Sequence, residues 1–214
     1  MRTIIFANGT LANPPKFYPE DTYIAADGGA THCLALNLKP DVVIGDMDSL
    51  NKEDYQKLKS MGSKFINHPS QKDFTDLELA LAYARDQGTD DILILAALGA
   101  RWDQTLANLL LPGNKEFANM RVRLIDGTQE IEMLHPGKTF ELNGHPGDIL
   151  SLIPIAGDAH GITTYGLEYP LNSESLLFGS TRGISNVILE CPVTMSFQQG
   201  LLMCILSHSN LENV

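Results

Sequence analysis

The segment TDLELALAYARDQGTDDILILAAL, residues 75–98, decides the fold class of this chain. Its first part predicts a helix over residues 75–87, because apolar side chains recur along it at helical spacing. Thr75 and Glu78 form a capping-box pattern at the start of this helix. The second part contains a continuous apolar run, residues 92–98, which is typical of a strand buried on both faces. A helix followed closely by such a strand indicates an α/β unit.

The same alternation extends through the first half of the chain. Apolar runs predict further buried strands at residues 4–7, 23–26 and 42–44. Amphipathic patterns predict further helices at residues 30–38, 52–61 and 103–111. We therefore expect residues 1–118 to form an α/β domain with a largely parallel sheet covered by helices on both sides.

After about residue 118 the pattern changes to short, often alternating segments separated by Gly-Thr, Pro-Gly and Asn-Gly turn signals. These segments predict strands at residues 122–126, 130–135, 138–142, 148–155 and 186–190. The apolar run at residues 201–206 fits either a strand or a helix. We expect residues 119–214 to form an all-β domain, a sandwich or jelly-roll-like fold.

The chain has 26 acidic and 15 basic residues, a formal net charge of −11. It lacks the basic surface that binds phosphate backbones or anionic membranes, so we expect neither nucleic acid nor membrane as a partner. Cys33, Cys191 and Cys204 are widely spaced, and we expect them to be reduced core residues of a cytoplasmic protein. The spacing of the six histidines matches no usual zinc site.

Aspartates gather where the predicted strands end and where the best helix begins. They are Asp27, Asp46, Asp48, Asp73, Asp76 and Asp103. Ligands of open α/β sheets bind outside the carboxyl ends of the strands, so these loops are expected to converge on one crevice. Hard oxygen ligands favour Mg²⁺, which would neutralise the carboxylates and bridge them to a polyphosphate. Lys72, Arg101 and the free N–H groups of the helix that begins at Thr75 would bind phosphate oxygens.

Each of these motifs alone has a simpler structural interpretation. An Asp-Gly pair is commonly a turn, and Asp76 could complement a helix dipole. Trp102 could stack on a ligand or pack in a core. Four such loops together nevertheless favour a shared site. The chain contains neither the Gly-x-Gly-x-x-Gly dinucleotide fingerprint nor a P-loop.

In this order, the motifs resemble those of the bacterial thiamine pyrophosphokinase family. They are ADGG at residues 26–29, GDMDS at 45–49, KDFTDLE at 72–78, GARWD at 99–103 and GISN at 183–186. The resemblance implies transfer of pyrophosphate from ATP to the hydroxyl of thiamine, giving thiamine diphosphate and AMP. It also implies an α/β catalytic domain, a β-sandwich thiamine-binding domain and a homodimer with active sites between subunits.

The resemblance also implies roles for single residues. It makes Asp46, Asp48 and Asp76 the Mg²⁺ ligands, with Asp27 and Asp103 lining the same site. It assigns the nucleotide to Asp27, Lys72, Asp73 and Arg101, beside the helix start at Thr75, and the substrate to Ser185 and Asn186. Arg101 and Asp103 join Asp73 as catalytic candidates, and we expect Asp73 to accept the alcohol proton. Ala100 and Gln104 depart from the family, which commonly has glycine and histidine there.

Two other functions remain open from sequence. One is a different Mg²⁺-dependent phosphoryl-transfer enzyme or phosphohydrolase. The other is a noncatalytic nucleotide- or thiamine-binding module. The departures from the family pattern at Ala100 and Gln104 slightly favour this alternative.

Overall fold

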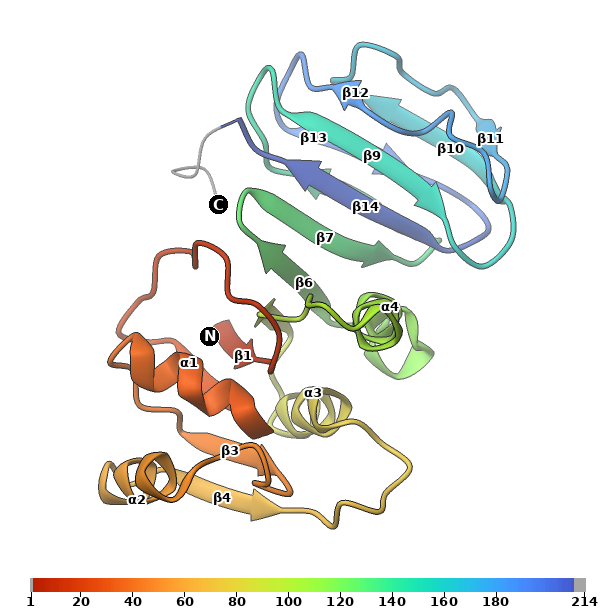
Figure 1. Cartoon of the computed structure of the whole chain (residues 1–214). Helices are drawn as coiled ribbons and strands as arrows, with labels where there is room; N and C mark the ends of the chain where they lie inside the picture. Colours follow the sequence, from red (N-terminus) through yellow and green to blue (C-terminus); the bar gives the residue numbers. More distant parts are fainter. Residues whose placement is uncertain (1, 210–214) are drawn as a thin grey trace. The chain divides into compact units, whose positions relative to one another are not determined.

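The computed structural model describes residues 2–209, which form two compact units (Figure 1). Within that range, unit 1 takes in residues 2–111 and 119–126, and unit 2 takes in residues 112–118 and 127–209.

The strands of unit 1 pair in parallel in the order β6-β5-β1-β2-β3-β4. Their bounds are β1 (Arg2–Phe6), β2 (Thr22–Ala26), β3 (Val42–Gly45), β4 (Lys64–Asn67), β5 (Asp91–Leu95) and β6 (Arg121–Asp126). The central strands β1, β2, β3 and β5 are buried along most of their length. This confirms the expected parallel sheet of buried strands.

The α-helices of unit 1 are α1 (Ala30–Ala35), α2 (Lys52–Ser60), α3 (Asp76–Asp86) and α4 (Trp102–Leu110). Helix α3 begins after Thr75, whose hydroxyl accepts a hydrogen bond from the Glu78 N–H at 3.2 Å. Its buried face, which includes Leu77 and Leu81, packs against β1, β2 and β3. Over residues 2–209, no helix combines the length and the apolar character that crossing a bilayer requires.

Two local predictions for unit 1 need correction, and one strand of unit 1 was missed. The helix expected over residues 30–38 ends at Ala35, and Asn37 follows with a left-handed backbone, φ 56°. The strand expected over residues 92–98 ends at Leu95, because Ala96 is left-handed at φ 55°. Strand β4 was not predicted, because it lies at the sheet edge with both terminal side chains exposed and so lacks an apolar run.

The limits of the two units differ from the domain boundary expected at residue 118. Strand β6 follows that boundary, yet it pairs in parallel with β5 and belongs to unit 1. Its alternating burial resembles that of the later antiparallel strands, so the sequence pattern alone grouped it with them.

A buried carboxylate anchors the start of β1. Asp21 accepts hydrogen bonds from Arg2, at 2.9 Å from Nε and 2.6 Å from Nη2, and from the Tyr18 N–H at 2.8 Å. Burial alone would raise the pKa of Asp21, but these hydrogen bonds and the Arg2 charge hold the pKa below its ordinary value. The ionised carboxylate therefore stabilises the fold.

Asp21→Asn is expected to lower the free energy of unfolding at pH 7 by about 2 kcal/mol, because it removes the charged partner of Arg2. The ionised Asp21 stabilises the fold above its unfolded pKa of about 3.9, and this contribution is lost as the pH falls through the lower folded pKa. Urea unfolding at pH 7 and pH 3 measures the effect, and the difference between the two proteins should narrow at pH 3. The control Asp86→Asn alters an exposed carboxylate paired with Arg85 and should have little effect. An equal difference at both pH values would contradict the account.

Unit 2 contains two antiparallel sheets, with strand orders β12-β9-β14-β7 and β11-β10-β13-β8. The strands are β7 (Gln129–Leu134), β8 (Thr139–Leu142), β9 (Ile149–Pro154), β10 (Ala159–Tyr165), β11 (Glu174–Leu176), β12 (Asn186–Val187), β13 (Val193–Ser196) and β14 (Leu202–Ser207). The ambiguous run at residues 201–206 is therefore a strand. Strands β10, β11 and β13 were not predicted, and the strand expected over residues 186–190 is only two residues long.

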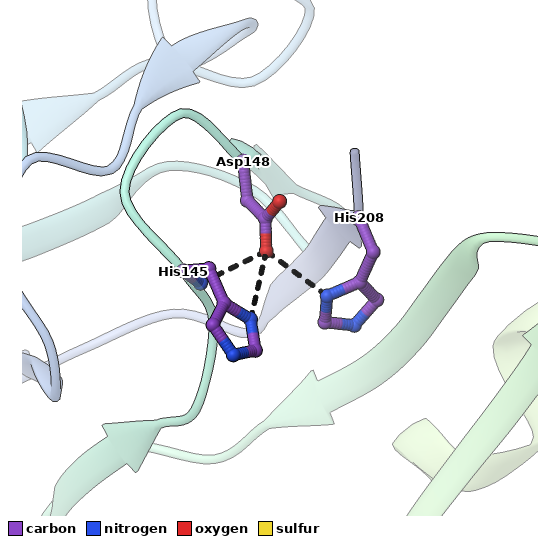
Figure 2. Close-up of side chains that lie close together, drawn as sticks. All are labelled: His145, Asp148 and His208. Atoms are coloured by element: carbon purple, nitrogen blue, oxygen red, sulfur yellow. Dashed lines mark hydrogen bonds and ion pairs between the residues drawn. The ribbon is translucent and has the colours of Figure 1, made fainter. Parts of the chain in front are cut away.

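The turn before β9 is held by another buried carboxylate (Figure 2). Asp148 is fully buried, and its Oδ2 accepts the His145 backbone N–H at 2.9 Å. Nδ1 of His208 lies 3.0 Å from the same oxygen, and the Ser209 N–H donates to Oδ1 at 2.8 Å. Burial alone would raise the pKa of Asp148, but these hydrogen bonds hold the pKa below its ordinary value. Asp148 thus joins this turn to the end of β14.

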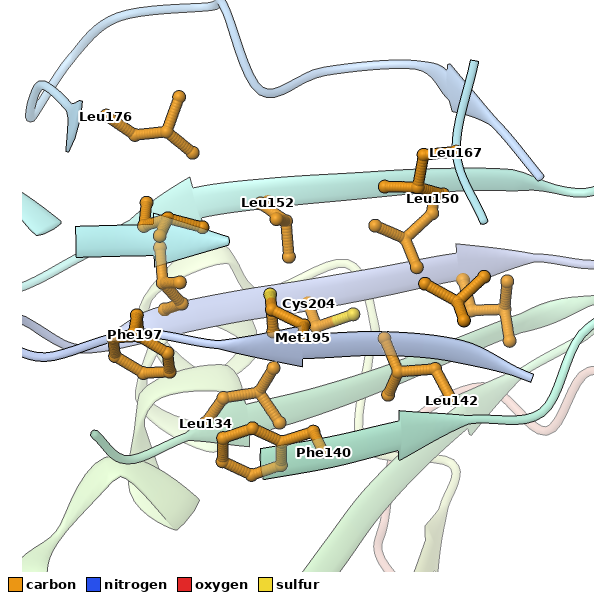
Figure 3. Packing of buried hydrophobic residues seen from close by; sticks show 14 of the residues in the cluster. Leu134, Phe140, Leu142, Leu150, Leu152, Leu167, Leu176, Met195, Phe197 and Cys204 are labelled. Carbon is orange, nitrogen blue, oxygen red and sulfur yellow. The ribbon is translucent and has the colours of Figure 1, made fainter. Parts of the chain in front are cut away.

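The core of unit 2 is formed by inward-facing residues of both sheets (Figure 3). Leu150 and Leu152 on β9 and Cys204 on β14 belong to the same buried cluster as Phe140 on β8 and Met195 on β13. Along these strands buried positions alternate with more exposed ones, the pattern of a β-sandwich. The sandwich expected for the second half is confirmed.

The cysteines only partly match the prediction. All three are free, and Cys33 and Cys204 are buried, but Cys191 is exposed. Its Sγ donates to the Gly144 carbonyl oxygen at 2.9 Å. Cys191 is therefore not a core residue.

Candidate active site

Three carboxylates converge at the carboxyl ends of β2 and β3 and at the start of α3. Asp27 follows β2, Asp46 follows β3, and Asp76 is the first residue of α3. Each contributes a carboxylate oxygen to a group whose atoms all lie within 4.8 Å of one another. We call Asp27, Asp46 and Asp76 the acidic cluster. It lies at the edge of the sheet where ligands of parallel α/β sheets bind.

Gly45 leaves the space that the side chains of this cluster occupy. It is the last residue of β3 and has φ 151°, a conformation that L side chains rarely adopt. A Cβ atom at this position would lie 2.9 Å from the Asp27 Cβ and 3.0 Å from the Asp76 Oδ1. The absence of a side chain at Gly45 is therefore what lets the carboxylates of Asp27 and Asp76 approach the end of β3.

Among residues 2–209, the charges of the acidic cluster are only partly balanced. Lys72 Nζ lies 2.8 Å from the Asp76 Oδ1. A hydrogen bond from Ser70, another from the Asp48 N–H and the charge of Lys72 hold the pKa of Asp46 below its ordinary value. Asp27 Oδ1 is buried and has no hydrogen-bond partner among residues 2–209. Three hard oxygen donors, one of them unpartnered, fit a divalent cation such as Mg²⁺.

The backbone around the cluster is strained. Asp27, Met47 and Ala96 all have positive φ, at 46°, 64° and 55°. They follow β2, β3 and β5, so the strain is concentrated in loops at one edge of the sheet. Non-glycine residues adopt this conformation at a cost, and such residues cluster at functional sites.

The loop after β1 also belongs to this edge, although the sequence did not single it out. Asn8 Nδ2 donates to the Ser49 Oγ at 3.4 Å, and a Cβ on Gly28 would lie 2.5 Å from the Asn8 side chain. A Cβ on Gly9 would lie 2.3 Å from the Leu98 carbonyl oxygen. The loops after β1, β2, β3 and β5 are thus in close contact. The short Asn8-Gly9 pair at the end of an apolar run was the available signal.

The remaining predicted residues of unit 1 lie outside the acidic cluster. Asp48 is exposed and accepts a hydrogen bond from the Ser49 hydroxyl at 3.2 Å. Asp73 is exposed in the loop before α3, where the Thr75 hydroxyl caps the helix. The carboxylates of Asp48 and Asp73 are not part of the acidic cluster. The roles predicted for these two residues therefore stay predictions.

Arg101 and Asp103 form an exposed ion pair at the start of α4. Arg101 Nε donates to the Asp103 Oδ1 at 3.2 Å, and its Nη2 donates to the other carboxylate oxygen. Hydrogen bonding from Arg101 lowers the pKa of Asp103. Trp102, between them, is 76% exposed, which excludes the core-packing alternative.

Unit 2 contains a separate pocket of about 500 Å³ beside Ser185 and Asn186. Ser185 has φ 60°, and its N–H donates to the Ser151 hydroxyl at 3.0 Å. The Asn186 side chain accepts the Tyr169 N–H at 3.0 Å and donates to the Tyr169 carbonyl oxygen at 2.8 Å. Other residues that line the pocket are Leu150, Leu152, Leu167, Glu168, Pro170, Leu171, Arg182, Gly183 and Ile184. The Asn186 amide therefore fixes the backbone beside Glu168.

Comparisons with known proteins identify the family. Residues 17–124 match the family model "Thiamin pyrophosphokinase, catalytic domain", and residues 138–202 match "Thiamin pyrophosphokinase, vitamin B1 binding domain". Thiamine pyrophosphokinase of Bacillus subtilis is 32% identical over 97% of this chain and 99% of its own length. The chain belongs to the thiamine pyrophosphokinase family. The acidic cluster lies within the part that matches the catalytic model, and Ser185 and Asn186 lie within the part that matches the vitamin B1 binding model.

Solved structures of thiamine pyrophosphokinases have the same fold. The Bacillus subtilis structure has a TM-score of 0.86 at 31% identity and covers 98% of this chain and all of its own. The Geobacillus thermodenitrificans structure has a TM-score of 0.84 at 27% identity, with complete coverage of both chains. The predictions of family, fold class and thiamine pyrophosphokinase activity made from the sequence are thereby confirmed.

Proposed function

We propose that the chain transfers pyrophosphate from ATP to thiamine at the acidic cluster, with unit 1 binding ATP and the metal and unit 2 binding thiamine. The observation that carries the site assignment is the convergence of Asp27, Asp46 and Asp76 around the open space at Gly45. A polyphosphate is strongly anionic, so it can bind beside three carboxylates only with a cation between them.

The cation that fits best is Mg²⁺, which is bound by few carboxylates and by substrate phosphates. When bound, it would neutralise phosphate charge during the transfer. Asp27, Asp46 and Asp76 would hold it. Asp48 is two residues from Asp46 on the same loop, and we retain it as a further ligand candidate. Asp103, in the first turn of α4, stays a candidate for lining the site.

The transfer needs the thiamine hydroxyl oxygen in line with the β-phosphorus of ATP. The new O–P bond forms there while the bond from the β-phosphorus to the oxygen of AMP breaks. Lys72 and Arg101 would bind phosphate oxygens and stabilise developing charge, and the free N–H groups at the start of α3 would support them. Asp73, which is exposed in the loop before α3, would accept the proton of the hydroxyl.

The pocket of unit 2 suits a cationic, partly aromatic substrate such as thiamine. Its lining combines leucine residues with Glu168 and Tyr169, whose side chains can contact a cation and an aromatic ring. Arg182 also lines the pocket, and its charge is paired with Glu174. Ser185 and Asn186 both line the pocket. The Asn186 side chain also holds the Tyr169 backbone in place through two hydrogen bonds.

Asn186→Ala is expected to raise the KM for thiamine about tenfold, because the Tyr169 backbone loses both hydrogen bonds that hold it. The KM for ATP should change little, since ATP binds in unit 1. Steady-state kinetics with each substrate varied in turn measure the two effects. Asn172→Ala, which alters an exposed asparagine outside the pocket lining, is the control. Equal increases in both KM values would contradict this role.

We infer further that the enzyme works as a homodimer whose active sites lie between subunits. An apolar stripe supports this: Trp102, Leu106 and Leu110 repeat every four residues on α4 and are 76%, 52% and 48% exposed. A stripe of this kind on a helix is typical of an interface. We place the dimer in the cytoplasm, where its free cysteines would remain reduced.

Leu106→Glu is expected to dissociate the dimer and lower activity at least about tenfold, because it places a charge within the apolar stripe. Ala107→Glu is a matched control, since Ala107 is exposed on the same helix but lies off the stripe. Sedimentation velocity and activity at the same protein concentration measure both effects. A fully active wild-type monomer would contradict the shared-site proposal.

The product assay tests the proposed reaction. The protein is incubated with thiamine, ATP and Mg²⁺, and we expect AMP and thiamine diphosphate in equal amounts. ADP with thiamine monophosphate would instead indicate a different phosphoryl-transfer enzyme. Binding without any product would indicate a noncatalytic module.

A further inference from the structure

A second cluster of metal-binding side chains lies in unit 2 and takes no part in the proposed reaction. It consists of His145, Asp148 and His208, which we call the histidine cluster (Figure 2). His145 and Asp148 lie in the turn before β9, and His208 follows β14. Sixty residues separate Asp148 from His208, so sequence spacing gave no indication of a site.

Both imidazoles turn a ring nitrogen toward the same carboxylate oxygen (Figure 2). His208 Nδ1 lies 3.0 Å and His145 Nδ1 lies 3.8 Å from the Asp148 Oδ2. The possible ligand atoms of the three residues all lie within 4.8 Å of one another. Ligand atoms of a tetrahedral ion with bonds near 2.1 Å lie roughly 3.4 Å apart, so small side-chain adjustments would complete this geometry.

The burial of the three residues suits a bound ion. Asp148 is fully buried and the His208 side chain is 2% exposed, so two donors are held by the fold. The Ser209 N–H holds the other Asp148 oxygen at 2.8 Å, which orients the carboxylate. The His145 side chain is 59% exposed, which leaves a path for an ion and a coordination position for water.

We propose that His145, Asp148 and His208 form a binding site for a divalent transition metal of the zinc type. Two imidazole nitrogens and one carboxylate oxygen favour such an ion over Mg²⁺, which prefers oxygen ligands alone. The ion would bind the Nδ1 lone pair of His208 in place of its hydrogen bond with Asp148, with the ring proton carried on Nε2. The ion would tie the turn before β9 to the end of β14 and so stabilise unit 2.

The test titrates metal-free protein with Co²⁺, whose visible absorption reports its ligands, and then displaces it with Zn²⁺. We expect one Co²⁺ per chain at this site, displaced by Zn²⁺. His145→Ala should weaken its binding at least about tenfold. Because the His145 side chain is largely exposed, this variant should remain folded.

Two control variants make the assignment specific. His160→Ala removes another exposed histidine, which contacts the Ser175 hydroxyl, and should leave Co²⁺ binding unchanged. Asp46→Asn alters the acidic cluster of unit 1 and should also leave it unchanged. The proposal is overturned if no Co²⁺ binds, if binding is the same in His145→Ala, or if it is lost in Asp46→Asn.

Discussion

Replacing Asp46 with asparagine is expected to lower kcat by on the order of 100-fold at a fixed Mg²⁺ concentration. Asp46 contributes one of three converging carboxylates, and hydrogen bonds from Ser70 and the Asp48 N–H keep its pKa low and its side chain ionised. The asparagine side chain has nearly the same shape but carries no charge, so the change removes a strong ligand from the cluster. The Mg²⁺ concentration needed for half-maximal activity should rise in parallel.

The control for this experiment is Asp86→Asn, which removes the same charge from an exposed position at the other end of α3. It should leave both kcat and the Mg²⁺ requirement unchanged. Asp48→Asn tests the further ligand candidate and is expected to lower turnover as well. If Asp46→Asn had normal activity without a raised Mg²⁺ requirement, the acidic cluster would not be the metal site.

Gly45→Ala is expected to reduce kcat by about 100-fold, because the added Cβ would lie 2.9 Å from the Asp27 Cβ and 3.0 Å from the Asp76 Oδ1. Two carboxylates would have to move for the chain to accommodate it. Alanine at φ 151° also strains the backbone. The substitution therefore displaces ligands without changing any charged residue.

Gly62→Ala separates the effect of backbone strain from the effect of crowding in the acidic cluster. Gly62 also has positive φ, 83°, but a Cβ there would have nothing within 4 Å. Both variants should lose roughly 1 kcal/mol of unfolding free energy from backbone strain, while only Gly45→Ala should lose activity. Urea unfolding and steady-state kinetics measure the two quantities. Similar activity losses in both variants would mean that crowding of the cluster is not the cause.

Local signals in the sequence were sufficient for the framework of unit 1. Helix α3 follows from its capping pattern and apolar face, and the central strands follow from apolar runs that are buried on both sides. Asp27, Asp46 and Asp76 could be predicted as neighbours because parallel strands place their carboxyl ends at one edge.

Contacts between distant segments could not be predicted in the same way. Asn8 contacts Ser49 only because the loops after β1 and β3 fold together, and the local pattern around each residue does not indicate the other as its partner. The approach of His208 to Asp148 depends on the pairing of β14 with β9. Strand β6 has the alternating pattern of an antiparallel strand, yet its parallel partner β5 places it in unit 1.

A crystal structure of the protein with Mn²⁺, thiamine and a nonhydrolysable ATP analogue tests the proposed catalytic site most directly. Mn²⁺ substitutes for Mg²⁺ at oxygen sites and can be located by its anomalous scattering. The account predicts a Mn²⁺ peak at about 2.2 Å from carboxylate oxygens of at least two of Asp27, Asp46 and Asp76, bridging to the phosphates of the analogue. Phosphates and metal bound away from these three carboxylates would contradict it.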